Sequence, residues 1–305
     1  MIPNVAHFVW LGKTFPWVYG LALKSAALRG GFHKVVLHHS DDIRHTSGWR
    51  TAMDTEQIVA RRLSAKTYLL QIEGMGTELW HLYRRLQQPA AKSNILRVAI
   101  LTVEGGVYLD TDIITLRPFL PLLDTGFFCG EERIALPANL LRSRWPHRWL
   151  AALGRIVVRD LLRRLPSGWR LFKRIELLYP AVVNNAVLGA EARHPLLIEM
   201  LQSMVAMGHS KQLQRYALGT HLLEEMVDRY GGDDMTLHPP FRFYPLGPEI
   251  SAHWFRHGGG DALEKILHPE TVCVHWYASV RTKKQLPLID DDFVATNQHR
   301  QLFSR

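Results

Sequence analysis

A helix that stops at two glycines and passes at once into an apolar strand restricts the fold of this chain most. Residues 90–103 have helical periodicity, Gly105 and Gly106 end the helix, and residues 107–110 form the strand. Upstream, the same alternation predicts strands over 5–10 and 34–38 and a helix over 19–28. Strands and helices that alternate along a chain predict an α/β fold with a mostly parallel central sheet flanked by helices.

The remaining segments are expected to be mainly helical. Residues 55–86 read as mostly helix, with a break between Gly74 and Gly76. Later helices are expected over 140–178, 195–207 and 220–229, and late strands over 242–244 and 272–277.

The composition is that of an ordinary globular chain. Its 305 residues are 47% hydrophobic and 21% charged, which excludes a disordered or collagen-like protein. The two cysteines, Cys129 and Cys273, cannot form a disulfide framework and suit a reducing compartment. The first residues lack the basic start of a secretory signal, and no run of about 18 uncharged apolar residues is present. We expect a cytoplasmic protein.

Most of the positive charge lies in one segment. The formal net charge is +9, and residues 140–179 hold ten basic residues against two acidic ones, Asp160 and Glu176, a local charge of +8. On a helical wheel Arg148, Arg155, Arg159 and Arg163 fall on one side. Apolar residues fall opposite, at Leu150, Leu153, Val157, Leu161 and Leu165.

Such a segment favours a helix that lies on an anionic membrane, with its apolar face in the headgroup region. Reversing the charges of Arg155, Arg159 and Arg163 should then release the protein from anionic liposomes. The alternative is an ordinary surface helix whose apolar face packs on the core. Nucleic acid is a poorer partner, because the sequence has no zinc-finger, RNP-type or helix-turn-helix motif.

Two aspartates, Asp110 and Asp112, come directly after the apolar strand. In extended backbone, residues i and i+2 share a face, so the pair can hold one hard divalent cation. The alternative is that the aspartates cap a turn or a helix. The spacing alone favours neither interpretation. A second triplet, Asp290-Asp291-Asp292, has no strand before it and is not expected to bind a metal.

Taken together, these residues resemble a known family. The run from Ser93 to Arg97, followed by Leu101 and by Glu104 to Asp112, is similar to the DXD-containing sugar-nucleotide glycosyltransferases of GT-A fold, family 32 type. The glucosyltransferase domains of the large clostridial toxins are similar in the same blocks. Weaker blocks keep the family order: His7-Phe8-Val9-Trp10, Asn184-Asn185, His194-Pro195, Phe243-Tyr244-Pro245 and His275-Trp276.

The resemblance implies a donor site for a nucleotide sugar. Trp10 would stack on the base, with Val9 beside it, and Arg97 would reach the donor hydroxyls or the diphosphate. Asn94 stands where the family has an acidic residue, so it can accept a hydrogen bond but lacks the charge. Further implied donor contacts are Ser93, Tyr108, Asp110, Asn184, Asn185 and Ser279.

The resemblance also implies a catalytic metal, Mn²⁺ or Mg²⁺. Asp112 resembles the direct ligand, Asp110 resembles the aspartate that holds the ion partly through water, and His275 is the candidate third ligand. The ion would neutralise the diphosphate leaving group. The implied catalytic residues are Asp110, Asp112, Arg97 and Asn185, with no general base assigned.

The implied protein is a retaining, metal-dependent glycosyltransferase with a nucleotide-sugar donor, a UDP-sugar being favoured. Its acceptor would be a glycan or a lipid-linked glycan at the inner face of a membrane, as in polysaccharide biosynthesis. Residues 1–130 would form a Rossmann-like, nucleotide-sugar-binding half and residues 131–305 a helical, acceptor-facing half of one integrated domain. Two alternatives stay open: an effector-type enzyme that glycosylates a protein side chain, and a non-catalytic membrane- or nucleic-acid-binding protein on a decayed glycosyltransferase fold.

Overall fold

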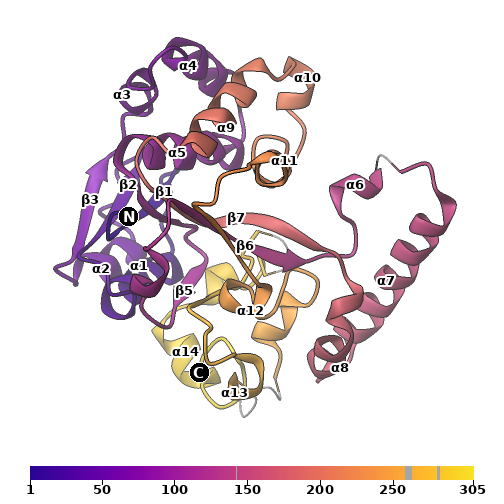
Figure 1. Cartoon of the computed structure of the whole chain (residues 1–305). Coiled ribbons are helices and arrows are strands. Elements are labelled where there is room, and N and C mark those ends of the chain that lie inside the picture. Colours follow the sequence, from indigo (N-terminus) through magenta and orange to yellow (C-terminus); the bar gives the residue numbers. More distant parts are fainter. Residues whose placement is uncertain (142, 258–262, 280–281) are drawn as a thin grey trace. The chain divides into compact units, whose positions relative to one another are not determined.

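The computed structural model describes residues 1–141, 143–257, 263–279 and 282–305, and the chain divides into two units (Figure 1). Unit 1 comprises Met1–Gly130 and Val183–His238, and unit 2 comprises Glu131–Val182 and Pro239–Arg305. The chain therefore passes between the units inside β6, inside β7 and after β8. Among the described residues, no helix has the length and the apolar character needed to span a bilayer.

Unit 1 contains most of the regular structure. Its strands are β1 (Val5–Trp10), β2 (Lys34–His39), β3 (Ile58–Arg62), β4 (Gly106–Leu109), β5 (Ile113–Thr115), β6 (Phe127–Arg133), β7 (Ala181–Ala190) and β8 (Met235–His238). Its helices are α1 (Trp17–Arg29), α2 (Ser47–Met53), α3 (Ala65–Leu70), α4 (Gly76–Arg85), α5 (Pro89–Glu104), η1 (Leu120–Leu122), α9 (Pro195–Ala206), α10 (His209–Gln212) and α11 (Thr220–Arg229).

A seven-stranded sheet forms the centre of unit 1, in the order β3-β2-β1-β4-β7-β6-β8. β1 pairs in parallel with β2 and β4, β2 with β3, and β6 with β8. β7 runs antiparallel to β4. The predicted α/β fold with a mostly parallel central sheet is confirmed.

Helices cover both faces of this sheet (Figure 1). α1 and α2 pack together on one face, and α3, α4, α5, α9 and α11 pack on the other. The second group forms a large apolar core with sheet residues that include Val9, Tyr108 and Leu188. Burial on both faces explains why the strands read as nearly continuous apolar runs.

Two glycines connect α5 to β4. Gly105 has φ +67° and Gly106 has φ +103°, values that residues with a side chain rarely adopt. A Cβ on Gly106 would lie 2.6 Å from the carbonyl oxygen of Val5. The glycines therefore allow β4 to enter the sheet beside β1, and β4 ends at the carboxyl edge, where ligands usually bind in open α/β sheets.

Unit 2 is mostly helical. Its elements are α6 (Ala138–Leu141), α7 (Pro146–Arg164), α8 (Gly168–Ile175), η2 (Glu176–Leu178), α12 (Pro240–Phe243), η3 (Ser251–Phe255), α13 (Leu263–Ile266), β9 (Cys273–His275), η5 (Leu286–Leu288) and α14 (Asp291–Asn297).

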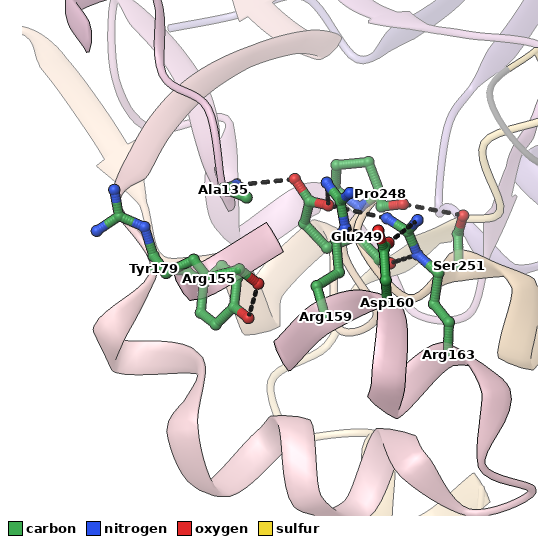
Figure 2. A network of polar contacts seen from close by, with 9 residues as sticks. All are labelled: Ala135, Arg155, Arg159, Asp160, Arg163, Tyr179, Pro248, Glu249 and Ser251. Atoms are coloured by element: carbon green, nitrogen blue, oxygen red, sulfur yellow. Dashed lines mark hydrogen bonds and ion pairs between the residues drawn. The ribbon is translucent and has the colours of Figure 1, made fainter. Parts of the chain in front are cut away.

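The basic face of α7 turns toward the interior of unit 2 (Figure 2). The side chains of Arg159 and Arg163 are each 14% exposed, and each pairs with Glu249 at 3.0 Å and with Asp160 at 2.9 Å. Burial alone would lower the pKa of Arg159, but its bonds to Asp160 and Glu249 outweigh burial and raise that pKa.

The apolar face of α7 is exposed to solvent instead, at Leu150, Leu153, Val157, Leu161 and Leu165. The expectation that Arg159 and Arg163 are available to lipid is therefore wrong, because Glu249 and Asp160 already hold them. The alternative in which the apolar face packs on the core is wrong as well.

Two secondary-structure predictions also need correction. Residues 242–244 were expected to form a strand, but the chain forms the short helix α12, whose first turn accommodates Pro240. Residues 55–86 were expected to be mostly helical, but they begin with the strand β3. β3 lies at the edge of the sheet, so its half-buried Val-Ala-Arg-Arg sequence lacks a strong apolar pattern.

Candidate functional site

α5, β4 and β7 bring polar side chains together at the carboxyl edge of β4 in unit 1. On α5, Arg97 lies four residues after Ser93 and three residues after Asn94, so its side chain neighbours both of theirs. Asp110 follows β4, and its backbone N–H donates to the carbonyl oxygen of Ala186 at 2.9 Å. This bond extends the β4–β7 ladder and places Asp110 beside β7.

Arg97 lies at the centre of this cluster. Its guanidinium forms an ion pair with Asp110 at 3.0 Å and donates to the carbonyl oxygen of Asn185. The guanidinium carbon also lies 4.5 Å from the ring centroid of Tyr108. The side chain is only 6% exposed, so these contacts hold the guanidinium of Arg97 in one position. They also connect α5 to β4 and β7.

Tyr108 supports the same aspartate. Its hydroxyl donates to Asp110 Oδ1 at 2.8 Å and lies 3.3 Å from Ser93 Oγ. Burial raises the pKa of Tyr108, so the hydroxyl keeps its proton and remains a donor. Arg97 and Tyr108 therefore fix the orientation of the Asp110 carboxylate from two sides.

A second pair of side chains lies next to this cluster. Asn185 Nδ2 donates to Asn94 Oδ1 at 3.0 Å. Gly219, just before α11, faces both amides, because a Cβ there would lie 2.7 Å from Asn94 Nδ2 and 2.9 Å from Asn185 Nδ2. The amide oxygen of Asn184 instead accepts from the backbone N–H of Ala186 at 2.7 Å, within its own strand.

Asp110 and Asp112 are brought close by a turn. The backbone N–H of Ile113 donates to the carbonyl oxygen of Asp110 at 3.0 Å, and Thr111 and Asp112 form the turn between them. The expectation that extended backbone aligns the two aspartates is therefore wrong, because the strand ends at Leu109. Each residue still offers a carboxylate oxygen within 4.8 Å of one from the other.

This donor set fits a hard divalent cation. Both aspartates are partly exposed, and carboxylate oxygens at such a separation can share one Mg²⁺ or Mn²⁺. Tyr19 on α1 lies near the pair: burial raises its pKa, and the negative charges of Asp112 and Asp110 raise it further. No sequence motif connects Tyr19 to the aspartates, because about ninety residues separate them.

Trp10 is the last residue of β1 and is half-buried. Its ring centroid lies 5.1 Å from that of Phe15 and 4.8 Å from that of Tyr19. Val9 is buried within the core and supports the strand end. Trp10 and the aspartates therefore share Tyr19 as a neighbour.

Two residues of the predicted site lie in unit 2. His275 is the last residue of β9, is buried, and has its ring centroid 3.8 Å from that of Tyr277. Ser279 is exposed and lies four residues further on. The roles predicted for His275 and Ser279 remain predictions.

Comparison with known proteins gives one family match. Residues 35–128 match the family model described as a glycosyltransferase sugar-binding region containing a DXD motif. The matched region includes α5, β4 and both aspartates. None of the curated proteins matches the chain.

Solved structures that match the chain include three structures of glycosyltransferase domains. The PaToxG glycosyltransferase is 16% identical, with a TM-score of 0.46 over 74% of this chain and 69% of that chain. The ligand-free glycosyltransferase domain of the YGT toxin is 10% identical, with a TM-score of 0.43 over 78% and 80%. The UDP-bound form of that toxin domain is 11% identical, with a TM-score of 0.36 over 76% of this chain and 68% of that chain.

The family match and the site around Asp110 define the class of the protein, a transferase that carries a sugar-binding region. More particularly, it is a glycosyltransferase whose DXD motif is Asp110-Thr111-Asp112. The predicted resemblance to DXD-motif glycosyltransferases is thereby confirmed. The assignment to family 32 remains a prediction.

Proposed function

We propose that the protein is a retaining, metal-dependent glycosyltransferase that takes its sugar from a UDP-sugar. The observation that carries this proposal is the pair of close, partly exposed carboxylates of Asp110 and Asp112 within the DXD region. A Mn²⁺ or Mg²⁺ ion bound there would neutralise the diphosphate that leaves with the nucleotide. In this proposal His275 supplies a third ligand.

The other side chains would bind and orient the donor. Trp10 would offer the flat face of its indole to the base, with Val9 supporting it. Arg97 and Tyr108 hold Asp110 in place, and Ser93, Asn94 and Asn185 lie where they can bond sugar hydroxyls. Asn184 and Ser279 are kept as further donor contacts.

The proposed reaction is a front-face displacement. The bond from the anomeric carbon to the diphosphate oxygen breaks while the acceptor oxygen bonds to the same face of that carbon. The acceptor proton passes to the leaving phosphate oxygen, so no protein base is required. Catalysis then depends on positioning and on charge, to which Asp110, Asp112, Arg97 and Asn185 contribute.

The proposed acceptor is a glycan or a lipid-linked glycan, bound by the half over residues 131–305. The half over residues 1–130 would bind the donor, with Asn184, Asn185 and Ser279 contributed by the second half. A lipid-linked acceptor would place the enzyme at the surface of a membrane. The excess of basic residues over residues 140–179 that remains apart from the paired Arg159 and Arg163 supports this location.

Calorimetric titration of UDP and GDP, each with and without Mn²⁺, tests the proposal on the wild type and on Asp112→Ala. We expect Mn²⁺-dependent UDP binding that the variant loses. Arg29→Ala is a suitable control, because Arg29 is exposed on α1 and should leave binding unchanged.

Each other outcome contradicts part of the proposal. Tighter binding of GDP than of UDP would indicate a GDP-sugar donor in place of a UDP-sugar. Nucleotide binding that does not need Mn²⁺ would contradict the proposed metal dependence. Nucleotide binding with transfer to protein side chains alone would favour the effector alternative. Failure of every nucleotide to bind would favour a non-catalytic protein.

A further inference from the structure

An apolar depression lies on the surface of unit 2, along the first half of α7. Its volume is about 750 Å³, within the usual range of small-molecule sites. Six apolar side chains larger than alanine line it, together with Ala152: Leu136, Pro146, Trp149, Leu150, Leu153 and Ile156. Leu150 is 68% exposed and Leu153 is 57% exposed, so the lining is open to an occupant. A concentrated apolar surface of this kind marks a binding site.

The charge around the depression is positive. Arg144 lines it together with the apolar residues, and Arg148 is exposed in the first turn of α7. The two acidic residues of segment 140–179 are both held in ion pairs, Asp160 by Arg159 and Arg163, and Glu176 by Lys173. An occupant that matches this surface therefore combines an apolar body with a negative charge.

A lipid has that combination, and a second copy of this chain does not. Two copies that met through α7 would bring together two segments in which basic residues outnumber acidic ones, which is unfavourable. Trp149 suits the boundary between water and lipid, since its ring lines the depression while its Nε1–H donates to the carbonyl oxygen of Ser143 at 3.0 Å.

We infer that this depression holds the aliphatic chain of a phosphate-bearing lipid of a membrane surface, with Arg144 beside the phosphate. The inference extends the membrane location of the proposed function and is independent of the nucleotide-sugar chemistry. Because Arg159 and Arg163 face Glu249, attachment depends on the apolar lining and on the exposed arginines at the start of α7.

Vesicle sedimentation provides the first test, with vesicles of phosphatidylcholine with and without phosphatidylglycerol. The variant Leu150→Glu/Leu153→Glu should lose at least tenfold in affinity for the anionic vesicles. The matched control Leu177→Glu/Leu178→Glu adds the same charge at residues that are 78% and 69% exposed and lie outside the depression. The control should bind as the wild type does, and equal loss in both variants would overturn the inference.

Monomeric alkyl phosphates test whether the depression itself is occupied. Dodecyl phosphate below its micellar concentration should change the fluorescence of Trp149, and each methylene that becomes buried should tighten binding by about fourfold. Arg144→Ala should weaken dodecyl phosphate more than a neutral dodecyl detergent. Binding that is independent of chain length, or that inorganic phosphate fully displaces, would overturn the inference. UDP binding should be unchanged in all these variants. A failure of the lipid inference can therefore be distinguished from a failure of the proposed glycosyltransferase function.

Discussion

Arg97 does two things at once in the DXD site. Its guanidinium pairs with Asp110 and also donates to the backbone carbonyl of Asn185 on β7, while the guanidinium carbon lies over the ring of Tyr108. The rigid fork of arginine allows the two directions, and a lysine could not serve both. The charge of Arg97 is therefore partly matched by Asp110 before any donor binds.

Asn94→Asp tests the residue that departs from the family pattern. A carboxylate can accept the bond that Asn185 Nδ2 donates to Asn94, so the local structure should be kept. A charged acceptor bonds a sugar hydroxyl more strongly than an amide does, by about 1.4 kcal/mol, so UDP-sugar hydrolysis should accelerate roughly tenfold. Release of UDP measures the rate.

The opposite change on the same hydrogen bond serves as the control. In Asn185→Asp the carboxylate has no proton to donate to Asn94, so the rate should fall. A gain in both variants, or in neither, would contradict a role of the Asn94–Asn185 pair in donor binding.

The sequence predicted the residues of this site that lie close together along the chain. Arg97, Tyr108, Asp110 and Asp112 fall within sixteen residues, so the resemblance to DXD-motif glycosyltransferases could identify them as one block, whereas spacing alone did not decide between a metal site and a turn. Tyr19 and Gly219 reach the site only through the fold, and neither belongs to a recognisable motif. The pairing of the aspartates was expected for the wrong reason, since sequence spacing cannot distinguish a strand from a turn.

At the scale of elements, α7 shows how amphipathic patterns can mislead. The helical wheel correctly separated arginines from leucines, but the pattern does not state which face is buried. Glu249 decides the orientation, and it lies about ninety residues away in the sequence. Asp290 is a simpler case, because it caps α14 by accepting from the backbone N–H of Phe293 at 2.8 Å.

Glu249→Gln should weaken the contact between the arginine face of α7 and the rest of unit 2. The side chain of Glu249 is 9% exposed and accepts from both Arg159 and Arg163, so its loss leaves two arginines without their buried partner. We expect the free energy of unfolding to fall by about 3 kcal/mol, measured by urea denaturation.

Glu176→Gln provides the comparison on the same segment. Its partner Lys173 is more exposed, so the cost should stay below about 1 kcal/mol. Equal costs for the two variants would contradict the view that Glu249 holds α7 in place.

At the scale of the whole molecule, a pair of buried histidines makes unit 1 sensitive to acid. His7 Nδ1 lies 3.1 Å from His38 Nε2, and His7 Nε2 lies 3.0 Å from the carbonyl oxygen of Gly105. His7 Nε2–H donates to Gly105, and the bond between the two rings forms only when at least one of them is neutral. Burial lowers the pKa of His7 to about 4 and that of His38 to about 2.

Stability should therefore fall as the pH decreases from about 6.5. The unfolded chain takes up protons on both histidines near pH 6.5, whereas the folded chain does not, so each histidine costs about 1.4 kcal/mol per pH unit. The contribution of His7 levels off near pH 4, where its folded form is protonated as well. Urea denaturation between pH 7 and pH 4 measures the slope.

His7→Gln identifies the source of this dependence. Glutamine does not titrate, so one proton fewer is taken up on unfolding. The slope of the unfolding free energy against pH should therefore decrease by about 1.4 kcal/mol per pH unit. His209→Gln changes an exposed histidine and should leave the slope as it is. A wild-type stability that is constant between pH 7 and pH 4.5 would contradict the role of the buried pair.

The outward leucines of α7 also determine the colloidal behaviour of the purified protein. At low ionic strength the repulsion between positively charged segments keeps molecules apart. At 1 M salt the screening length shrinks to about 3 Å, and the leucine faces of different molecules can then meet. Solubility should consequently decrease as salt is added, and mild detergent rather than salt is the natural way to keep this enzyme dispersed.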